Sequence, residues 1–216
     1  MDKIQKQSAL ALLIEQFGDV TLSADAYTLA EEDWYDTSHA HMDGQPRPCF
    51  NFDYPLSQWL ADEEQELRSS HGWWREIEKE EAINALKQQR KMRNMYPNWQ
   101  DIPVDYLCAY YIGFTFSSSA GFYFYTPALL MWMFQQDELN DCKRHYLETA
   151  FDSWAFNITY LSQHGDLDRK LKDFSDKQIH TLIVLLNQIS NPKNDLSEIV
   201  VALTNYRDSR LVLQMV

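Results

Sequence analysis

The chain has 216 residues and a net charge of −13, and 45% of its residues are hydrophobic and 14% aromatic. This composition is typical of a folded globular protein and excludes intrinsic disorder. The surplus of carboxylates excludes a nucleic-acid binder and a protein attracted to anionic membranes, since both need a basic surface.

Cysteine usage and hydropathy indicate a cytoplasmic protein. Cys49, Cys108 and Cys142 are widely spaced and odd in number, which fits neither a disulfide framework nor a zinc knuckle. The longest apolar segment, residues 120–134, is shorter than the ~20 residues that cross a bilayer. We therefore expect one cytoplasmic domain over residues 1–216, without a membrane partner.

The first third of the chain predicts two helices followed by a long loop. The first helix runs from a cap at Asp2 to Gly18, and a short second helix runs over residues 23–30. Helical spacing predicts that the buried side of the first helix is formed by Leu10, Leu13, Ile14 and Phe17. Residues 37–55 hold one glycine and three prolines without periodicity, and a loop of this length is often functional or disordered.

The middle of the chain predicts two polar helices and one central apolar helix. The polar helices cover residues 55–67 and 73–95. Segment 120–136 is apolar on nearly all sides, which indicates a helix in the centre of the fold, and Pro127 should kink it. Residues 101–116 fit either a buried helix or a strand, so a short strand near 105–116 is left open.

Two patterns near the C-terminus predict further helices. Residues 138–156 place Leu147, Phe151, Trp154 and Ile158 on one side. Ser175 and Gln178 form a capping-box pattern before an apolar helix, and a last helix follows Asp195. Together the segments predict a mainly α, single-domain bundle of about seven to eight helices around the apolar helix.

One segment resembles a known family. In residues 114–132, seven positions match a pattern close to F-L-S-P-E-x-x-x-Y-Y-L-P-A-x-L: Phe116, Ser117, Tyr123, Tyr125, Pro127, Ala128 and Leu130. This pattern is similar to that of a family of uncharacterised bacterial proteins, a domain of unknown function. The resemblance implies a bacterial, cytosolic and mainly helical protein, and it assigns no catalytic residue.

The strongest candidate for a metal site is the pair His39 and His41, in the loop 37–55. Alternate residues of an extended segment point the same way, and two imidazoles with a nearby carboxylate suit zinc or iron. Cys142 and His145 share a helix face, but no third ligand accompanies them, so we expect a buried cysteine beside a surface histidine. Because the pair is a short motif and no phosphate-binding loop or esterase pattern is present, we expect no enzyme, no cofactor and no bound metal.

The charge distribution predicts a protein partner. Residues 1–66 carry 14 acidic and three basic side chains, while the rest of the chain carries 18 acidic and 16 basic ones. Complementary charge selects partners and speeds their encounter. The sequence therefore favours a non-catalytic acidic binding protein, and most specifically an immunity-type antagonist that blocks a basic bacterial toxin or effector. The expected contact residues are Asp33, Trp34, Tyr35, Asp36, Asp43, Asp53, Asp62, Glu63, Glu64 and Glu66.

Two alternatives come from other classes of protein. The first is a metal-dependent enzyme built on His39, His41 and a carboxylate. The second is a structural or adaptor protein that uses the apolar helix 120–136 as a partly exposed interface.

Overall fold

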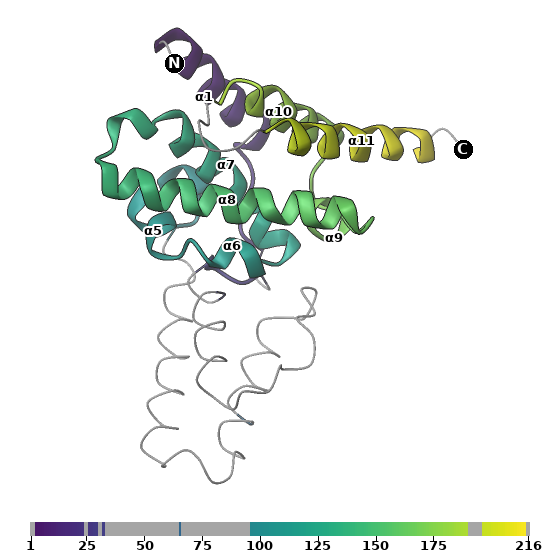
Figure 1. Ribbon diagram of the computed structural model, residues 1–216, viewed down its shortest axis with the longest axis horizontal. Coiled ribbons are helices and arrows are strands. Elements are labelled where there is room, and N and C mark those ends of the chain that lie inside the picture. The colour runs from purple at the N-terminus through teal and green to yellow at the C-terminus, as the bar shows by residue number, and fades with distance from the viewer. Residues whose placement is uncertain are drawn as a thin grey trace.

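A computed structural model describes residues 3–23, 26–29, 32, 65, 96–189 and 196–214, and these residues are mainly helical (Figure 1). The α-helices are α1 (Lys3–Phe17), α5 (Val104–Ala109), α6 (Gly113–Phe116), α7 (Ser119–Phe134), α8 (Asp141–Gln163), α9 (Asp168–Leu171), α10 (Asp176–Leu186) and α11 (Ser197–Gln214). Two 3-10 helices, η1 (Trp99–Asp101) and η2 (Gln136–Glu138), join them. The described ranges contain no strand, so the prediction of a mainly α helical bundle is confirmed.

Helix α7 lies in the centre of the fold, as its apolar sequence predicts. It contacts α1, α8, α9, η1 and η2, and most of its side chains are buried. The Ser118 hydroxyl caps its first turn by accepting a hydrogen bond from the Gly121 amide at 3.1 Å. Pro127 lies inside the helix and removes one backbone donor, while the predicted kink stays a prediction.

Helix α8 packs along α7 and is longer than its predicted range of residues 138–156. Asn140 caps its start, where its side-chain oxygen accepts a hydrogen bond from the Lys143 amide at 2.9 Å. The four apolar side chains predicted to share one side are all buried. The helix continues to Gln163 because the first residue that breaks it is Gly165, whose φ is +69°. The Gly165 amide donates a hydrogen bond to the Ser162 carbonyl, and the Asp166 amide donates one to the Leu161 carbonyl. These two bonds form a Schellman motif that ends the helix.

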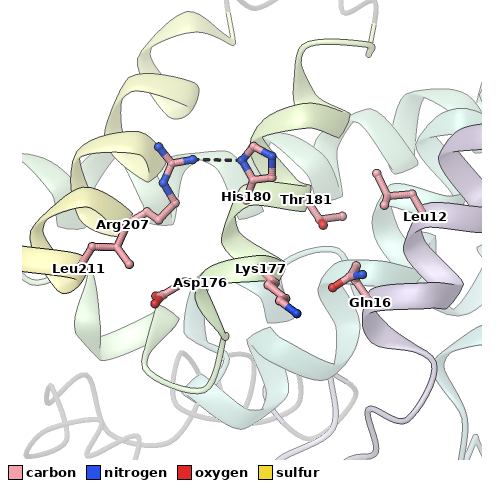
Figure 2. A pocket seen from close by; sticks show the side chains of 8 residues that line it. All are labelled: Leu12, Gln16, Asp176, Lys177, His180, Thr181, Arg207 and Leu211. Carbon is pink, nitrogen blue, oxygen red and sulfur yellow. Dashed lines mark hydrogen bonds between the residues drawn. The ribbon is translucent and has the colours of Figure 1, made fainter. Parts of the chain in front are cut away.

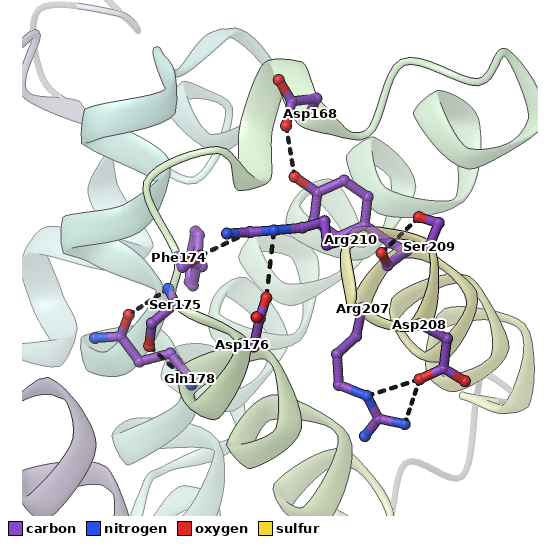
Figure 3. Close-up of polar contacts among 10 residues, drawn as sticks. Asp168, Phe174, Ser175, Asp176, Gln178, Arg207, Asp208, Ser209 and Arg210 are labelled. Carbon is purple, nitrogen blue, oxygen red and sulfur yellow. Dashed lines mark hydrogen bonds and ion pairs between the residues drawn. The ribbon is translucent and has the colours of Figure 1, made fainter. Parts of the chain in front are cut away.

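Helix α10 packs between α1 and α11, and α11 also contacts α8 (Figure 1). The predicted capping box is confirmed. The Gln178 amide donates to the Ser175 hydroxyl at 3.2 Å, and the Ser175 amide donates to the Gln178 side chain at 2.9 Å (Figure 3).

The segment 101–116 forms η1, α5 and α6, so the short strand near 105–116 does not form. Helical spacing explains this result. Tyr106 and Tyr110 lie one helical turn apart, and the centroids of their rings are 4.9 Å apart. Val104 and Leu107 of the same helix are buried in the core. Gly113 then begins α6, where the chain turns toward α7.

Two further expectations near the N-terminus are wrong. Ile14 is 56% exposed, because the buried side of α1 follows Ala9, Leu13 and Phe17 at four-residue spacing. The short helix predicted over residues 23–30 is also wrong, because residues 26–28 are not helical.

The backbone of Tyr27 and Leu29 lies directly against two buried glycines, Gly121 and Gly113 respectively. A Cβ on Gly113 would come within 2.7 Å of the Leu29 carbonyl oxygen. Packing of this segment against α6 therefore overrides its local helix preference.

Candidate functional site

The ten expected contact residues all lie outside the part of the chain that the structure describes. This applies to Asp33, Trp34, Tyr35, Asp36, Asp43, Asp53, Asp62, Glu63, Glu64 and Glu66. It applies equally to the loop 37–55, to His39 and His41, and to the predicted helix 73–95. The site described below therefore rests on other residues.

An exposed row of aromatic side chains runs along the outer side of α8. We call Tyr146, Phe156, Tyr160 and His164 the α8 aromatic row. Tyr146, Phe156 and Tyr160 are 42%, 57% and 47% exposed. Phe156, Tyr160 and His164 follow each other at four-residue spacing, so they stand one above the other on one face.

The rings of the row support one another. The Phe156 and Tyr160 rings are stacked with centroids 5.5 Å apart, and the Tyr160 and His164 rings are 4.2 Å apart. The His164 Nδ1 lies 2.7 Å from the Tyr160 carbonyl oxygen, which can only accept, so Nδ1 carries the proton. At the other end of the row, Tyr146 packs against Tyr111 at 5.8 Å. The surface is thus held in place before any partner arrives.

The fold does not need this row for its core. The opposite side of α8 already supplies Leu147, Phe151, Trp154 and Ile158 to the interior. Large aromatic side chains that stay exposed on a rigid helix are the residue types that anchor protein interfaces.

The charges around the row favour a basic partner. Glu148 and Asp152 lie on the same side of α8, two turns and one turn before Phe156, respectively. The cations at the start of the helix are already engaged. Lys143 pairs with Asp105 at 2.7 Å, and Arg144 donates to two backbone carbonyls of the α7–α8 connection. This side of the helix therefore carries both rings and carboxylates.

The two described cysteines, Cys108 and Cys142, form no metal site, and the thiol of Cys108 is poorly reactive. Cys142 is exposed, which corrects the expectation of a buried thiol beside a surface His145. In the described ranges, no group of three His, Cys, Asp or Glu side chains is placed to hold a metal ion. Burial raises the pKa of the Cys108 thiol to about 11, with a smaller contribution from Asp105. A thiol with this pKa is protonated at neutral pH and reacts poorly.

A buried ionic cluster joins α9 to the start of α7. The Lys170 ammonium donates to the Ser117 carbonyl and lies 3.3 Å from the Ser117 hydroxyl. The Glu32 carboxylate accepts from the Ser118 amide at 3.1 Å. A lysine beside a serine hydroxyl is an arrangement that can activate a nucleophile. Here Ser117 is 1% exposed and its hydroxyl donates to the Phe114 carbonyl, so the cluster positions helices.

Burial lowers the pKa of Lys170 to about 7, although the Glu32 carboxylate opposes the shift. The ammonium also lies 5.5 Å from the centre of the Phe122 ring. No sequence pattern indicates this cluster, because Lys170 stands in the charged segment Asp166–Lys172, which has the composition of an exposed turn.

One protein-family model matches most of the chain. A model of a family of unknown function, DUF6714, matches residues 60–210. The chain belongs to the DUF6714 family. This match confirms the expected membership of a family of unknown function, and it covers most of the chain. No curated protein and no solved structure matches the chain. Among the described residues, no helix is both long and apolar enough to cross a membrane.

Some of the candidate surfaces lie within the residues that the DUF6714 model matches, and others lie outside them. It includes α8 with its aromatic row and the acidic residues Asp62 to Glu66. It leaves out α1 and the expected contact residues between Asp33 and Asp53. The spacing of Phe156, Tyr160 and His164 is visible in the sequence. The sequence did not separate this exposed side from the buried one, since both sides of the helix carry aromatic residues.

Proposed function

We propose that this DUF6714 protein is a non-catalytic binding protein for a basic protein partner, and more specifically an immunity-type antagonist that blocks a basic bacterial toxin or effector. The observation that supports it most directly is the α8 aromatic row, exposed on a rigid helix and flanked by Glu148 and Asp152. The net charge of −13 and the acidic first third of the chain also favour a basic partner.

The chemistry of such a partner follows from the surface. Proteins that attack nucleic acids or nucleotides hold their substrate with Lys and Arg, so a blocking protein needs carboxylates opposite them. Rings of Phe and Tyr add apolar area and accept cations over their faces. In this proposal Phe156 and Tyr160 are the anchors, and Glu148 and Asp152 meet basic side chains. The acidic residues Asp33 to Glu66 supply long-range attraction.

The two alternatives have less support. The metal-dependent enzyme rests on His39 and His41, which lie outside the described residues. The adaptor hypothesis relies on an apolar helix that is partly exposed, whereas α7 is mostly buried within the chain itself. An adaptor would need another surface.

The proposal is tested by capture followed by neutralisation. The tagged chain is incubated with lysate of its native bacterium at low and high salt, and captured proteins are identified by mass spectrometry. The same capture is run with Phe156→Ala/Tyr160→Ala and with Ile4→Ala/Ile14→Ala. The second pair removes exposed side chains from α1 and leaves the row intact. Each captured basic protein is then expressed in a bacterial host with and without this chain.

The expected result is one basic protein that is toxic when expressed alone and harmless when co-expressed. Its capture should weaken with salt and with the α8 pair, and it should survive the α1 pair. A captured protein that is not toxic would reject the antagonist and leave a binding protein. Capture that does not depend on the α8 pair would show that another surface binds. Stoichiometric metal in the purified chain would favour the enzyme.

A further inference from the structure

A groove lies over α10, with α1 on one side and α11 on the other (Figure 2). Its volume is about 480 Å³, which is within the range of small-molecule sites. The groove is open to solvent and is lined by Leu12, Gln16, Asp176, Lys177, His180 and Arg207, with Thr181 and Leu211 beside them.

The polar groups of the groove are mainly hydrogen-bond donors. The Arg207 Nη1 lies 3.0 Å from the His180 Nδ1. A guanidinium can only donate, so Nδ1 accepts and the neutral ring carries its proton on Nε2. Arg207 is itself held by the Asp208 carboxylate, at 3.0 Å from Nε and 2.7 Å from Nη2 (Figure 3). His180 is thereby fixed as a donor at the groove.

The carboxylate that lines the groove is already neutralised. Asp176 forms an ion pair with Arg210 at 3.3 Å (Figure 3). Arg210 is held in turn by the Phe174 carbonyl at 2.8 Å and by the face of the Tyr206 ring. Lys177 makes no ion pair with any residue that the structure describes, and Figure 2 shows its ammonium beside Gln16. In a chain with a net charge of −13, this groove is a local site of uncompensated positive charge.

Two further features restrict the ligand. Lys177 lies in the first turn of α10, where the helix dipole favours an anion. Leu12 and Leu211 face the groove from the two flanking helices and provide aliphatic surface (Figure 2). We propose that the groove between α1, α10 and α11 binds a small aliphatic carboxylate, with its carboxylate at Lys177 and His180 and its chain along Leu12 or Leu211. This inference does not rest on the function proposed above.

The test uses octanoate as the probe and the full chain labelled with ¹⁵N and ¹³C. Two control ligands separate the contributions, because acetate has the carboxylate without the chain and octylammonium has the chain with the opposite charge. Small ligands gain about 0.3 kcal/mol per heavy atom, so octanoate should bind with a Kd on the order of a few millimolar. The NMR shifts should be confined to Lys177, His180, Leu211 and their neighbours.

Matched variants decide whether these side chains form the site. Lys177→Gln should weaken octanoate about fivefold, the value of one surface charge pair, whereas Lys172→Gln on an exposed lysine outside the groove should have no effect. Leu211→Ala should weaken octanoate, and Val212→Ala, on the adjacent exposed residue, should not. Octylammonium binding as tightly as octanoate would overturn the proposal. An unchanged Kd in Lys177→Gln, shifts elsewhere in the chain, or no saturation would overturn it as well.

Discussion

The ammonium of Lys170 donates to the backbone carbonyl of Ser117 inside the protein, where the lysine side chain is 2% exposed. The contact joins α9 to the α6–α7 connection, and Ser117 and Ser118 together hold a lysine and a glutamate. A buried lysine of this kind links the stability of the fold to pH.

The sign of that link follows from the pKa of Lys170, which is about 7 in the folded chain and 10.5 when unperturbed. Between these two values the unfolded chain binds a proton that the folded chain does not, so stability rises with pH. Lys170→Met removes the group. We expect the free energy of unfolding of the wild type, relative to Lys170→Met, to increase from pH 7 to pH 10. Urea titrations at each pH measure it, and Lys172→Met, at an exposed lysine, should show no such trend.

A second prediction concerns the centre of the core. The Trp154 indole donates to the Thr126 hydroxyl at 2.9 Å, and that hydroxyl donates to the Phe122 carbonyl at 2.6 Å. Thr126→Val keeps the shape and leaves the buried indole N–H unsatisfied, which should cost about 1–3 kcal/mol of unfolding free energy. Trp154→Phe removes the same bond from the other side. In a double-mutant cycle the two losses should be less than additive by about 1 kcal/mol. Strict additivity would mean that the bond contributes nothing.

The capping box of α10 gives a third prediction. Ser175→Ala removes the hydroxyl that accepts from the Gln178 amide and should destabilise the protein by about 1 kcal/mol. Ser8→Ala changes an exposed serine inside α1, where alanine is the better helix former, and should stabilise slightly. Thermal or urea unfolding should therefore give opposite signs for the same chemical change. Equal signs would show that the cap is not formed in solution.

These contacts also show which parts of the fold the sequence could predict. The capping box and the apolar segment of α7 are local patterns, and both correspond to what the structure contains. Ile14 was misjudged, and the burial of Lys170 was not predicted, because both environments depend on segments distant in sequence. Whether a side chain is buried is decided by the helix that packs against it, and a single helix pattern does not contain that information.

The candidate site was missed for the same reason. The α8 helix carries aromatic residues on two sides, with Trp154 in the core and Phe156 at the surface. Helical periodicity assigns them to different faces without saying which face is inside. The groove over α10 was equally hidden, since α1 and α11, from opposite ends of the chain, pack on its two sides.

Cysteine reactivity provides a fourth prediction. The thiol of Cys108 has a pKa of about 11 and contacts the Lys143 carbonyl, whereas Cys142 is exposed. Because the thiolate is the reactive form, iodoacetamide at about pH 8 should modify Cys142 quickly and Cys108 slowly. Peptide mass spectrometry follows each site separately, and unfolding in urea should remove the difference. Rapid labelling of Cys108 in the folded chain would contradict its raised pKa.

The fifth prediction compares two phenylalanines of α8 that differ only in where they point. Phe151 is fully buried and packs on Trp154 at 5.5 Å, so Phe151→Ala should cost about 3–5 kcal/mol of unfolding free energy. Phe156 is 57% exposed, and Phe156→Ala should change stability by about 0.5 kcal/mol or less. Urea unfolding of both variants measures the contrast. If Phe156→Ala were as costly as Phe151→Ala, the ring would belong to the core. A small cost leaves Phe156 free to serve a partner, which is the condition that the proposed binding surface requires.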